Sequence, residues 1–165
     1  MATPTSLPAT FVAGNVLTAA QMNDLRGAFR ILQVVQTAHS TEFSTTSTSF
    51  VDVTGLSVSI TPTSATSKVL VMVNASAETT GTDFVIATVF RGGAATGTNL
   101  GNGSVGFGAL RADSQERGFL SYTYLDSPAT TSATTYNVAV RVTTSTGYVM
   151  RADATNTITV MEVSA

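Results

Sequence analysis

The sequence predicts a mainly β protein, an antiparallel β-sandwich or jelly roll that follows an extended arm and one short α-helix. Charged residues make up only 11% of the 165 residues, whereas the strand-favouring residues Val, Thr and Ile are abundant. Short apolar segments alternate with polar residues at the period of two that a half-buried strand requires. The connections between these segments are too short and too polar for crossover helices, which favours antiparallel pairing.

The N-terminal part is predicted as an arm over 1–14 and a helix over 15–33. Thr18 is a suitable N-cap, and Gln21, three residues later, completes a capping box. An apolar stripe at spacings of 3, 4 and 3 follows along the helix: Met22, Leu25, Phe29 and Leu32. This stripe packs either on the chain's own domain or on identical helices of other copies, as a short seam. We therefore assign 1–33 to attachment and oligomerisation, and 34–165 to the sandwich.

Strands are predicted over most of the remaining chain. Their approximate bounds are 31–38, 49–53, 55–61, 68–77, 84–91, 118–125, 135–144, 147–152 and 157–163. Three groups alternate clearly, and each should share one face: Leu56, Val58 and Ile60; Val69, Val71, Val73 and Ala75; and Tyr136, Val138, Val140 and Val142. The segment 84–90 is apolar on both faces, which is typical of a central strand or of a strand beneath an interface.

Two longer connections are candidates for binding. Residues 92–108 are rich in Gly, Asn, Ala and Thr, and residues 126–135 form a Ser/Thr-rich loop. Loops on a rigid scaffold carry binding sites more often than the strands do. We therefore expect any ligand to contact these two segments.

Several classes of partner do not fit the composition. The eight basic residues are scattered singly, which does not fit a nucleic-acid-binding surface. The chain has no cysteine, so we expect neither disulfides nor thiolate metal sites. No segment approaches the roughly 20 apolar residues of a membrane-spanning helix, and the N-terminus lacks the features of a secretory signal. We expect neither nucleic acid nor membrane as a partner.

No motif indicates catalysis, a cofactor or a metal. Residues 101–106 match the dinucleotide fingerprint G-x-G-x-x-G, but the surrounding sequence predicts strands and not the helix that this motif requires. His39 is the only histidine and lacks the partners of a metal site or a triad. Asp113 and Glu116 lie between two arginines, so we interpret them as a salt-bridged turn and not as a glycosidase pair. We expect a protein that is not an enzyme.

Two charged residues lie within otherwise apolar or hydroxyl-rich strands. Arg141 and Glu162 could pair across a sheet if their strands are neighbours, and an ion pair at an interface between chains is the alternative. Either arrangement would compensate for burying a charge. The sequence leaves this choice open.

Two parts of the chain resemble bacteriophage virion proteins. Residues 11–24 (FVAGNVLTAAQMND) resemble an N-terminal segment that recurs in phage tail and fibre proteins. Residues 31–37 (ILQVVQT), 43–62 (FSTTSTSFVDVTGLSVSITP) and 67–73 (SKVLVMV) resemble the start of a small β-domain of phage structural proteins. Residues 157–163 (TITVMEV) resemble the last strand of that domain.

The resemblance implies a non-enzymatic virion component that docks through its N-terminus and projects a jelly-roll head. Such heads are commonly trimeric, like sandwiches of the tumour-necrosis-factor type. The implied partners are capsid, portal, collar or tail proteins, and the short chain favours a head fibre, a decoration protein, or a tail or collar accessory. The alternative is a receptor- or glycan-binding module whose partner is a host surface glycan.

Aromatic residues dominate permanent interfaces between chains, so they are the candidates for the centre of a trimer contact. The predicted contact residues outside the helix are Phe84, Phe90, Phe119, Tyr122 and Tyr124. An equally good interpretation places these five side chains in the core of the sandwich. The sequence does not distinguish the two.

Overall fold

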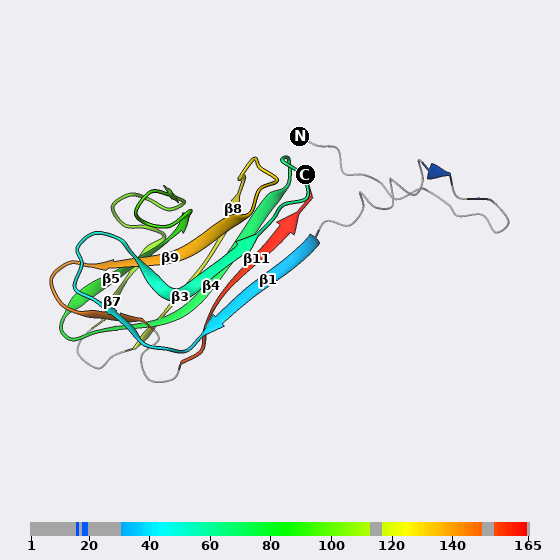
Figure 1. Ribbon diagram of the computed structural model, residues 1–165. Coiled ribbons are helices and arrows are strands. Elements are labelled where there is room, and N and C mark those ends of the chain that lie inside the picture. Colours follow the sequence, from blue (N-terminus) through cyan, green and yellow to red (C-terminus); the bar gives the residue numbers. More distant parts are fainter. Residues whose placement is uncertain (1–15, 17, 20–30, 113–116, 150–153, 165) are drawn as a thin grey trace.

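A computed structural model of the chain describes residues 16, 18–19, 31–112, 117–149 and 154–164, and the strands form a two-layer antiparallel sandwich (Figure 1). Sheet A contains β1 (Ile31–His39), β2 (Phe43–Thr45), β4 (Lys68–Thr79), β8 (Gly118–Asp126), β10 (Gly147–Val149) and β11 (Asn156–Val163). Sheet B contains β3 (Val51–Ile60), β5 (Asp83–Arg91), β6 (Thr98–Asn99), β7 (Gly108–Ala112) and β9 (Thr134–Val142). The predicted antiparallel β-sandwich is confirmed.

The strands are connected as in a jelly roll. In sheet A the order is β1-β11-β4-β10-β2, and β8 also pairs with β4. In sheet B the order is β3-β9-β5-β6, and β7 also pairs with β5. Strands β3, β4 and β5, and then β7, β8 and β9, alternate between the two sheets, so consecutive strands face each other across the core. β5 pairs with β9 on one side and with β6 and β7 on the other. This arrangement confirms the prediction that β5 is a central strand.

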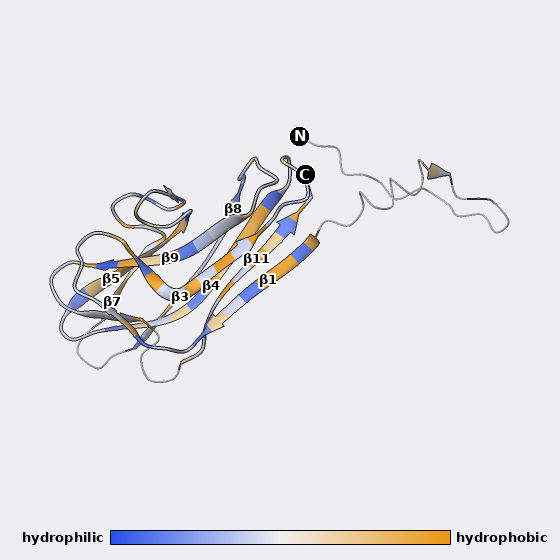
Figure 2. Cartoon of the chain, viewed as in Figure 1, coloured by the Kyte–Doolittle hydropathy of each residue, from blue (hydrophilic) through white to orange (hydrophobic). Residues whose placement is uncertain are grey.

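The core lies between the sheets and is built mainly from valine. All three predicted alternating groups point into it, and none of their members is more than 4% exposed. Figure 2 shows that apolar and polar bands follow one another along β1, without a strict period of two. Burying one Val or Leu side chain contributes about 1.5–3 kcal/mol. In a chain without disulfides, this core is the main source of stability.

The predicted strands differ from the observed ones in two respects. The segments 49–53 and 55–61 belong to one strand, β3, whose register shifts between Asp52 and Ser57. Gly55 lies at this shift with a φ of +82°, and the ring of His39 packs against it. β2, β6 and β7 were not predicted, because strands of two to five residues are too short to show alternation.

β1 begins earlier than the predicted end of the helix. Leu32 was assigned to the helical stripe, but it lies in β1, where Ile31 pairs with Val163 and Gln33 pairs with Glu162 of β11. The backbone of this segment therefore finds its hydrogen bonds in the sheet. Ala19 is helical, and the rest of the predicted helix up to residue 30 lies outside the described residues.

The glycines of the G-x-G-x-x-G segment pack against the edge of β5. The backbone N–H of Phe107 donates to the carbonyl of Ala87 at 2.9 Å, and β7 follows, not a helix. Gly106 has a φ of +57°, and a Cβ there would lie 2.2 Å from the Ala87 oxygen. A Cβ at Gly101 would lie 2.7 Å from Thr88 Oγ1. Close backbone packing thus accounts for glycine at these two positions.

Candidate functional site

The outer face of sheet A carries a continuous row of apolar side chains. Val34 of β1 pairs with Met161 of β11, Met161 pairs with Leu70 of β4, and Leu70 pairs with Leu125 of β8. The neighbouring positions on these strands face the core, so this row points away from it. Val34 is 54% exposed and Leu125 is 47% exposed. The row therefore crosses four strands and remains open to solvent.

This face is also nearly uncharged over the part where the four strands are paired. Its outward side chains are Leu32, Val34, Gln36 and Ala38 of β1; Lys68, Leu70, Met72 and Asn74 of β4; Phe119, Ser121, Thr123 and Leu125 of β8; and Thr157, Thr159, Met161 and Val163 of β11. Lys68 is the only charged one, and its Nζ donates to Ser127 Oγ at 3.2 Å. Such a face suits burial against another protein better than exposure.

The outer face of sheet B is different, because the segment between β6 and β7 partly covers it. The Arg141 guanidinium donates to the carbonyl oxygens of Ser104 and Thr48. It also lies 5.6 Å from the ring centroid of Phe50, which in turn packs edge-on against Phe90. The segment between β6 and β7 is thereby held over this sheet. The two outer faces therefore differ in what they can bind.

Arg141 and Glu162 do not pair across a sheet, which was one of the two arrangements that the sequence left open. Arg141 lies in β9 of sheet B, and Glu162 lies in β11 of sheet A. Glu162 is fully buried and accepts hydrogen bonds from Gln33 Nε2 and from the N–H and hydroxyl of Thr63 at 2.7–2.8 Å. Burial alone would raise the pKa of Glu162, but hydrogen bonds from Gln33, Ser67 and Thr63 outweigh it and lower that pKa.

The predicted contact residues occupy three different places. Met22, Leu25 and Phe29 lie outside the described residues, and Leu32 lies on the outer face of sheet A. Phe84, on β5, is 40% exposed, and Phe90 is buried on the same strand. Phe119, Tyr122 and Tyr124 all lie on β8. No single cluster contains all of them.

The aromatic residues of β8 form an edge of the sandwich together with Phe107. Phe107 stacks on Tyr122 with ring centroids 5.0 Å apart, and it lies at a tilt against Tyr124 at 5.4 Å. Phe119 is 84% exposed. A crevice of about 170 Å³ opens here between β7 and β8, lined by Phe107, Leu110, Phe119 and Tyr122 among others. Burial raises the pKa of Tyr122 well above its usual range, so this tyrosine stays neutral. We call this region the aromatic edge.

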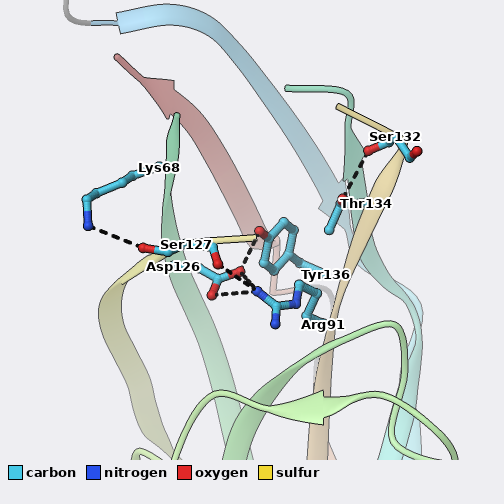
Figure 3. A network of polar contacts seen from close by, with 7 residues as sticks. All are labelled: Lys68, Arg91, Asp126, Ser127, Ser132, Thr134 and Tyr136. Atoms are coloured by element: carbon cyan, nitrogen blue, oxygen red, sulfur yellow. Dashed lines mark hydrogen bonds and ion pairs between the residues drawn. The ribbon is translucent and has the colours of Figure 1, made fainter. Parts of the chain in front are cut away.

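The two predicted binding loops meet at one end of the sandwich. Arg91 Nη1 contacts both carboxylate oxygens of Asp126 at 2.8 and 2.9 Å, and the Tyr136 hydroxyl donates to Asp126 Oδ2 at 2.8 Å (Figure 3). Burial, together with the hydrogen bond to Asp126, raises the pKa of Tyr136 beyond its usual range. A polar pocket of about 610 Å³ adjoins this network and is lined by residues of both loops, including Gly93 and Pro128.

This pocket lies at the end of the sandwich where β1 begins. Asp126 pairs with Val69, and the neighbouring residue of β4, Lys68, pairs with Val163. Val163 pairs in turn with Ile31, the first residue of β1. Figure 1 shows the C-terminal end of β11 beside the start of β1. The segment preceding residue 31 therefore joins the sandwich at the same end as the two loops.

The described part of the chain does not contain a catalytic or metal-binding constellation that we recognise. No three His, Cys, Asp or Glu side chains among the described residues are grouped as a metal site would require. Asp113 and Glu116 lie outside the described residues, and Arg117 pairs with Glu78 at 3.3 Å. Within the described ranges, no helix has the length and hydropathy needed to cross a membrane.

Comparison with protein-family models and with curated proteins found no match. A solved structure of infectious bursal disease virus, Gt strain, aligns over 83% of this chain and 38% of its own, with 11% identity and a TM-score of 0.47. A mutant VP2 protein of the same virus, in derived T=1 particles, aligns over 81% of this chain and 36% of its own, with 10% identity and a TM-score of 0.46. The chain thus spans less than two fifths of those viral proteins. At these values, the similarity says nothing about function.

Proposed function

We propose that this chain is a non-enzymatic structural protein of a bacteriophage particle, where it acts as a head fibre, a decoration protein, or a tail or collar accessory. Its sandwich forms a homotrimer, and its N-terminal segment docks on capsid, portal, collar or tail proteins. The resemblance to phage virion proteins supports the virion role and the trimer, and it covers residues 11–24, 31–37, 43–62, 67–73 and 157–163. The observation that supports assembly is the solvent-exposed apolar row on the outer face of sheet A.

The argument for assembly rests on the chemistry of that face. Val34 and Leu125 are about half exposed, and they flank Met161 and Leu70 in one row. Burying this row against another copy removes apolar surface from water at about 25 cal/mol per Å². Because Lys68 is the only charged side chain where β1, β11, β4 and β8 are paired, few charged groups would need to be desolvated there.

The outer face of sheet A is too small to form a stable interface by itself. Four strands about 4.8 Å apart, with about seven residues each at about 3.3 Å per residue, make a face of roughly 20 by 23 Å, or about 450 Å². A stable interface buries about 800 Å² from each partner. The face therefore supplies about half of the required surface, and neighbouring parts of the sandwich must contribute the rest.

The position of the loops favours this role over receptor binding. The loops at 92–97 and 127–133 lie at the end of the sandwich where β1 begins. In a protein that docks through the segment before residue 31, this end faces the particle. A receptor-binding site is expected at the opposite end, which faces away from the particle.

Light scattering tests the proposal, with two valines of equal exposure as a matched pair. Three chains of 17.0 kDa give 3 × 17.0 = 51.0 kDa for the wild-type protein. Val34→Lys places a charge on the outer face and should yield monomers. Val105→Lys changes a valine that is 52% exposed, against 54% for Val34, and should leave the trimer intact. A monomeric wild-type protein would contradict the trimer.

The virion role needs its own test. Mass spectrometry of purified particles from the virus that encodes the chain should detect the protein in a copy number divisible by three. Its absence from particles that contain all other structural proteins would contradict the role.

A further inference from the structure

We propose that the two edge strands of sheet A, β1 and β8, pair with each other between copies and so close three copies of sheet A into one ring. This inference rests on the proposed trimer and names the contact that forms it. β8 of each copy takes β1 of the next copy as an antiparallel partner, and the outer faces of the three sheets point toward the three-fold axis. The occupant of each open edge is therefore a second copy of this chain.

The first step is that both edges of sheet A are open. Within the described residues, β1 pairs only with β11 and β8 pairs only with β4, so each strand has one backbone edge without a strand partner. Neither strand carries a charged side chain or a proline before its last residue. Natural sheets usually protect an open edge with a charge, a proline or a bulge. A long edge without such protection can add a strand from another chain.

The edges of sheet B are protected in this way. β3 carries Asp52 and a shift in register, and β7 carries Arg111. In sheet A, the register of β1 shifts only at its start, between Ile31 and Gln33, and the ladder from Val34 onward is regular. The edges of sheet A are therefore better suited to strand addition than those of sheet B.

The second step is the direction of the strands. β8 is antiparallel to β4, β4 to β11, and β11 to β1, so β8 and β1 run in opposite directions within one sheet. A neighbouring copy in the same orientation thus presents β1 to β8 as an antiparallel partner. The outer face of sheet A stays on the same side, and the segments before β1 all leave at one end. Docking of three copies on one particle requires this arrangement.

A two-fold contact between edges does not meet this requirement. It would pair β8 with β8, or β1 with β1, because it brings the same part of two chains together. An antiparallel ladder of that kind inverts one copy, so the segments before β1 leave at opposite ends. A cyclic arrangement joins two different edges of each chain and keeps all copies in one orientation. The direction of the strands therefore favours a ring.

The third step is that three such sheets close without a channel. The paired part of sheet A is about 20 Å wide, so the centre of a triangle with this side lies about 6 Å from each sheet. Two sheets packed face to face lie about 10 Å apart, so side chains reach about 5 Å from each. The apolar row and Phe119 would therefore meet near the axis. Lys68 is the first residue of β4, where the ring opens to solvent.

The edges also supply the surface that the outer face lacks. With a sheet about 10 Å thick and about 23 Å long, two edges add about 460 Å² to the roughly 450 Å² of the face. Each copy then buries about 900 Å² against its two neighbours, which is close to the 800 Å² that each partner contributes to a stable interface. The new ladder also satisfies backbone groups at both edges.

The apolar row determines the register of the contact. Cyclic symmetry has no translation along its axis, so a row perpendicular to the strands meets its own beginning in the next copy. Leu125 ends the row on β8 and Val34 begins it on β1, so these two residues lie opposite each other between copies. Antiparallel pairing then places Ser121 opposite Ala38, and all four side chains lie on the outer face.

Cysteine cross-linking tests this contact, because the chain has no cysteine of its own. In the double variant Val34→Cys with Leu125→Cys, the two cysteines of one chain lie three strand spacings apart, about 14 Å, which is too far for a disulfide. Opposite residues of paired strands have Cα atoms about 4.5–5.5 Å apart, which suits a disulfide. Oxidation with copper phenanthroline should therefore give covalent trimers of 3 × 17.0 = 51.0 kDa and no larger species.

Three further double variants serve as matched controls. Ala38→Cys with Ser121→Cys is the second pair of the proposed register and should also give covalent trimers. Val34→Cys with Ser121→Cys, and Ala38→Cys with Leu125→Cys, displace one sulfur by four residues, about 13 Å along the strand, and should not cross-link. All four side chains are exposed, so the variants should fold, which a thermal melt under reducing conditions checks.

The outcomes separate this inference from the proposed trimer. If the wild-type protein is a trimer by light scattering but the matched pairs cross-link no better than the displaced pairs, the inference is overturned while the trimer stands. Covalent dimers alone would indicate a two-fold contact, and products larger than 51.0 kDa would indicate an open chain, so either result overturns the ring. A wild-type monomer would overturn the inference and the trimer together.

Discussion

The hydroxyl of Tyr136 donates a 2.8 Å hydrogen bond to Oδ2 of Asp126, and this bond joins the two sheets at one end of the sandwich. Tyr136 is fully buried, and Asp126 is 5% exposed. Arg91 contacts the same carboxylate from β5, so one acidic side chain satisfies two partners from the opposite sheet. The sandwich is thus fixed by a polar contact at this end as well as by its valine core.

Removing the tyrosine hydroxyl should weaken the protein moderately. Tyr136→Phe deletes one buried hydrogen bond to a charged group, and we expect a loss of about 1.5–3 kcal/mol in the free energy of unfolding. Urea denaturation at pH 7 measures this loss. Ser127→Ala is the control, because it removes an exposed contact with Lys68 from the same network and should cost less than about 0.5 kcal/mol. Equal losses in the two variants would contradict the bridging role of Tyr136.

Asp83 should make the stability of the protein depend on acid pH. Its carboxylate accepts hydrogen bonds from Thr143, from Thr144 and from the backbone and hydroxyl of Ser145. Burial opposes the charged form, but these bonds outweigh it and hold the pKa of Asp83 well below its usual range.

The sign of the effect follows from this direction. A lowered pKa in the folded state stabilises the protein above the unfolded pKa of about 3.9, and the contribution is lost as the pH falls below it. We expect the free energy of unfolding to fall between about pH 4 and pH 2. Asp83→Asn should lower stability at pH 7 by about 2 kcal/mol and flatten this dependence. An Asp83→Asn profile parallel to wild type would show that other carboxyl groups, such as Glu162, cause the loss.

Gly106 should tolerate no side chain. Its positive φ and its distance to the Ala87 carbonyl both oppose a Cβ, and the obstacle is backbone that cannot rotate away. Gly106→Ala should destabilise the protein by about 2 kcal/mol or more. In the same loop, a Cβ at Gly103 would have nothing within 4 Å, so Gly103→Ala should be neutral or slightly stabilising. Thermal melts of the two variants check this difference, and similar melting temperatures would refute it.

Gln33 should contribute more to the stability of the protein than Gln36, which lies on the same strand, β1. Its Nε2 donates to Glu162 Oε2 and to the Thr61 carbonyl, both at 2.7 Å, and so ties β1 to a buried charge. Gln33→Ala should cost about 1–3 kcal/mol, because the buried carboxylate loses a donor. Gln36→Ala removes a part-buried bond to the neutral hydroxyl of Thr159 and should cost less, about 1 kcal/mol or below. Denaturant midpoints of both variants measure the difference.

The sequence by itself determined the fold class and most of the core. The alternation of Val69, Val71 and Val73 requires a strand with one buried face, because successive side chains in a strand point to opposite sides. The apolar segment 84–90 likewise indicated a central strand. These conclusions depend only on the local period of two, which a single sequence carries.

Only the tertiary structure decided which strands are neighbours, and the candidate surfaces depend on this. Val34, Met161, Leu70 and Leu125 are far apart in the sequence, and nothing local marks them as one row. The same pairing placed Arg141 and Glu162 in different sheets, so the two do not pair across a sheet of one chain. In a jelly roll, consecutive strands alternate between sheets, so neighbours within a sheet come from distant parts of the chain. Long-range pairing therefore decides what each outer face carries.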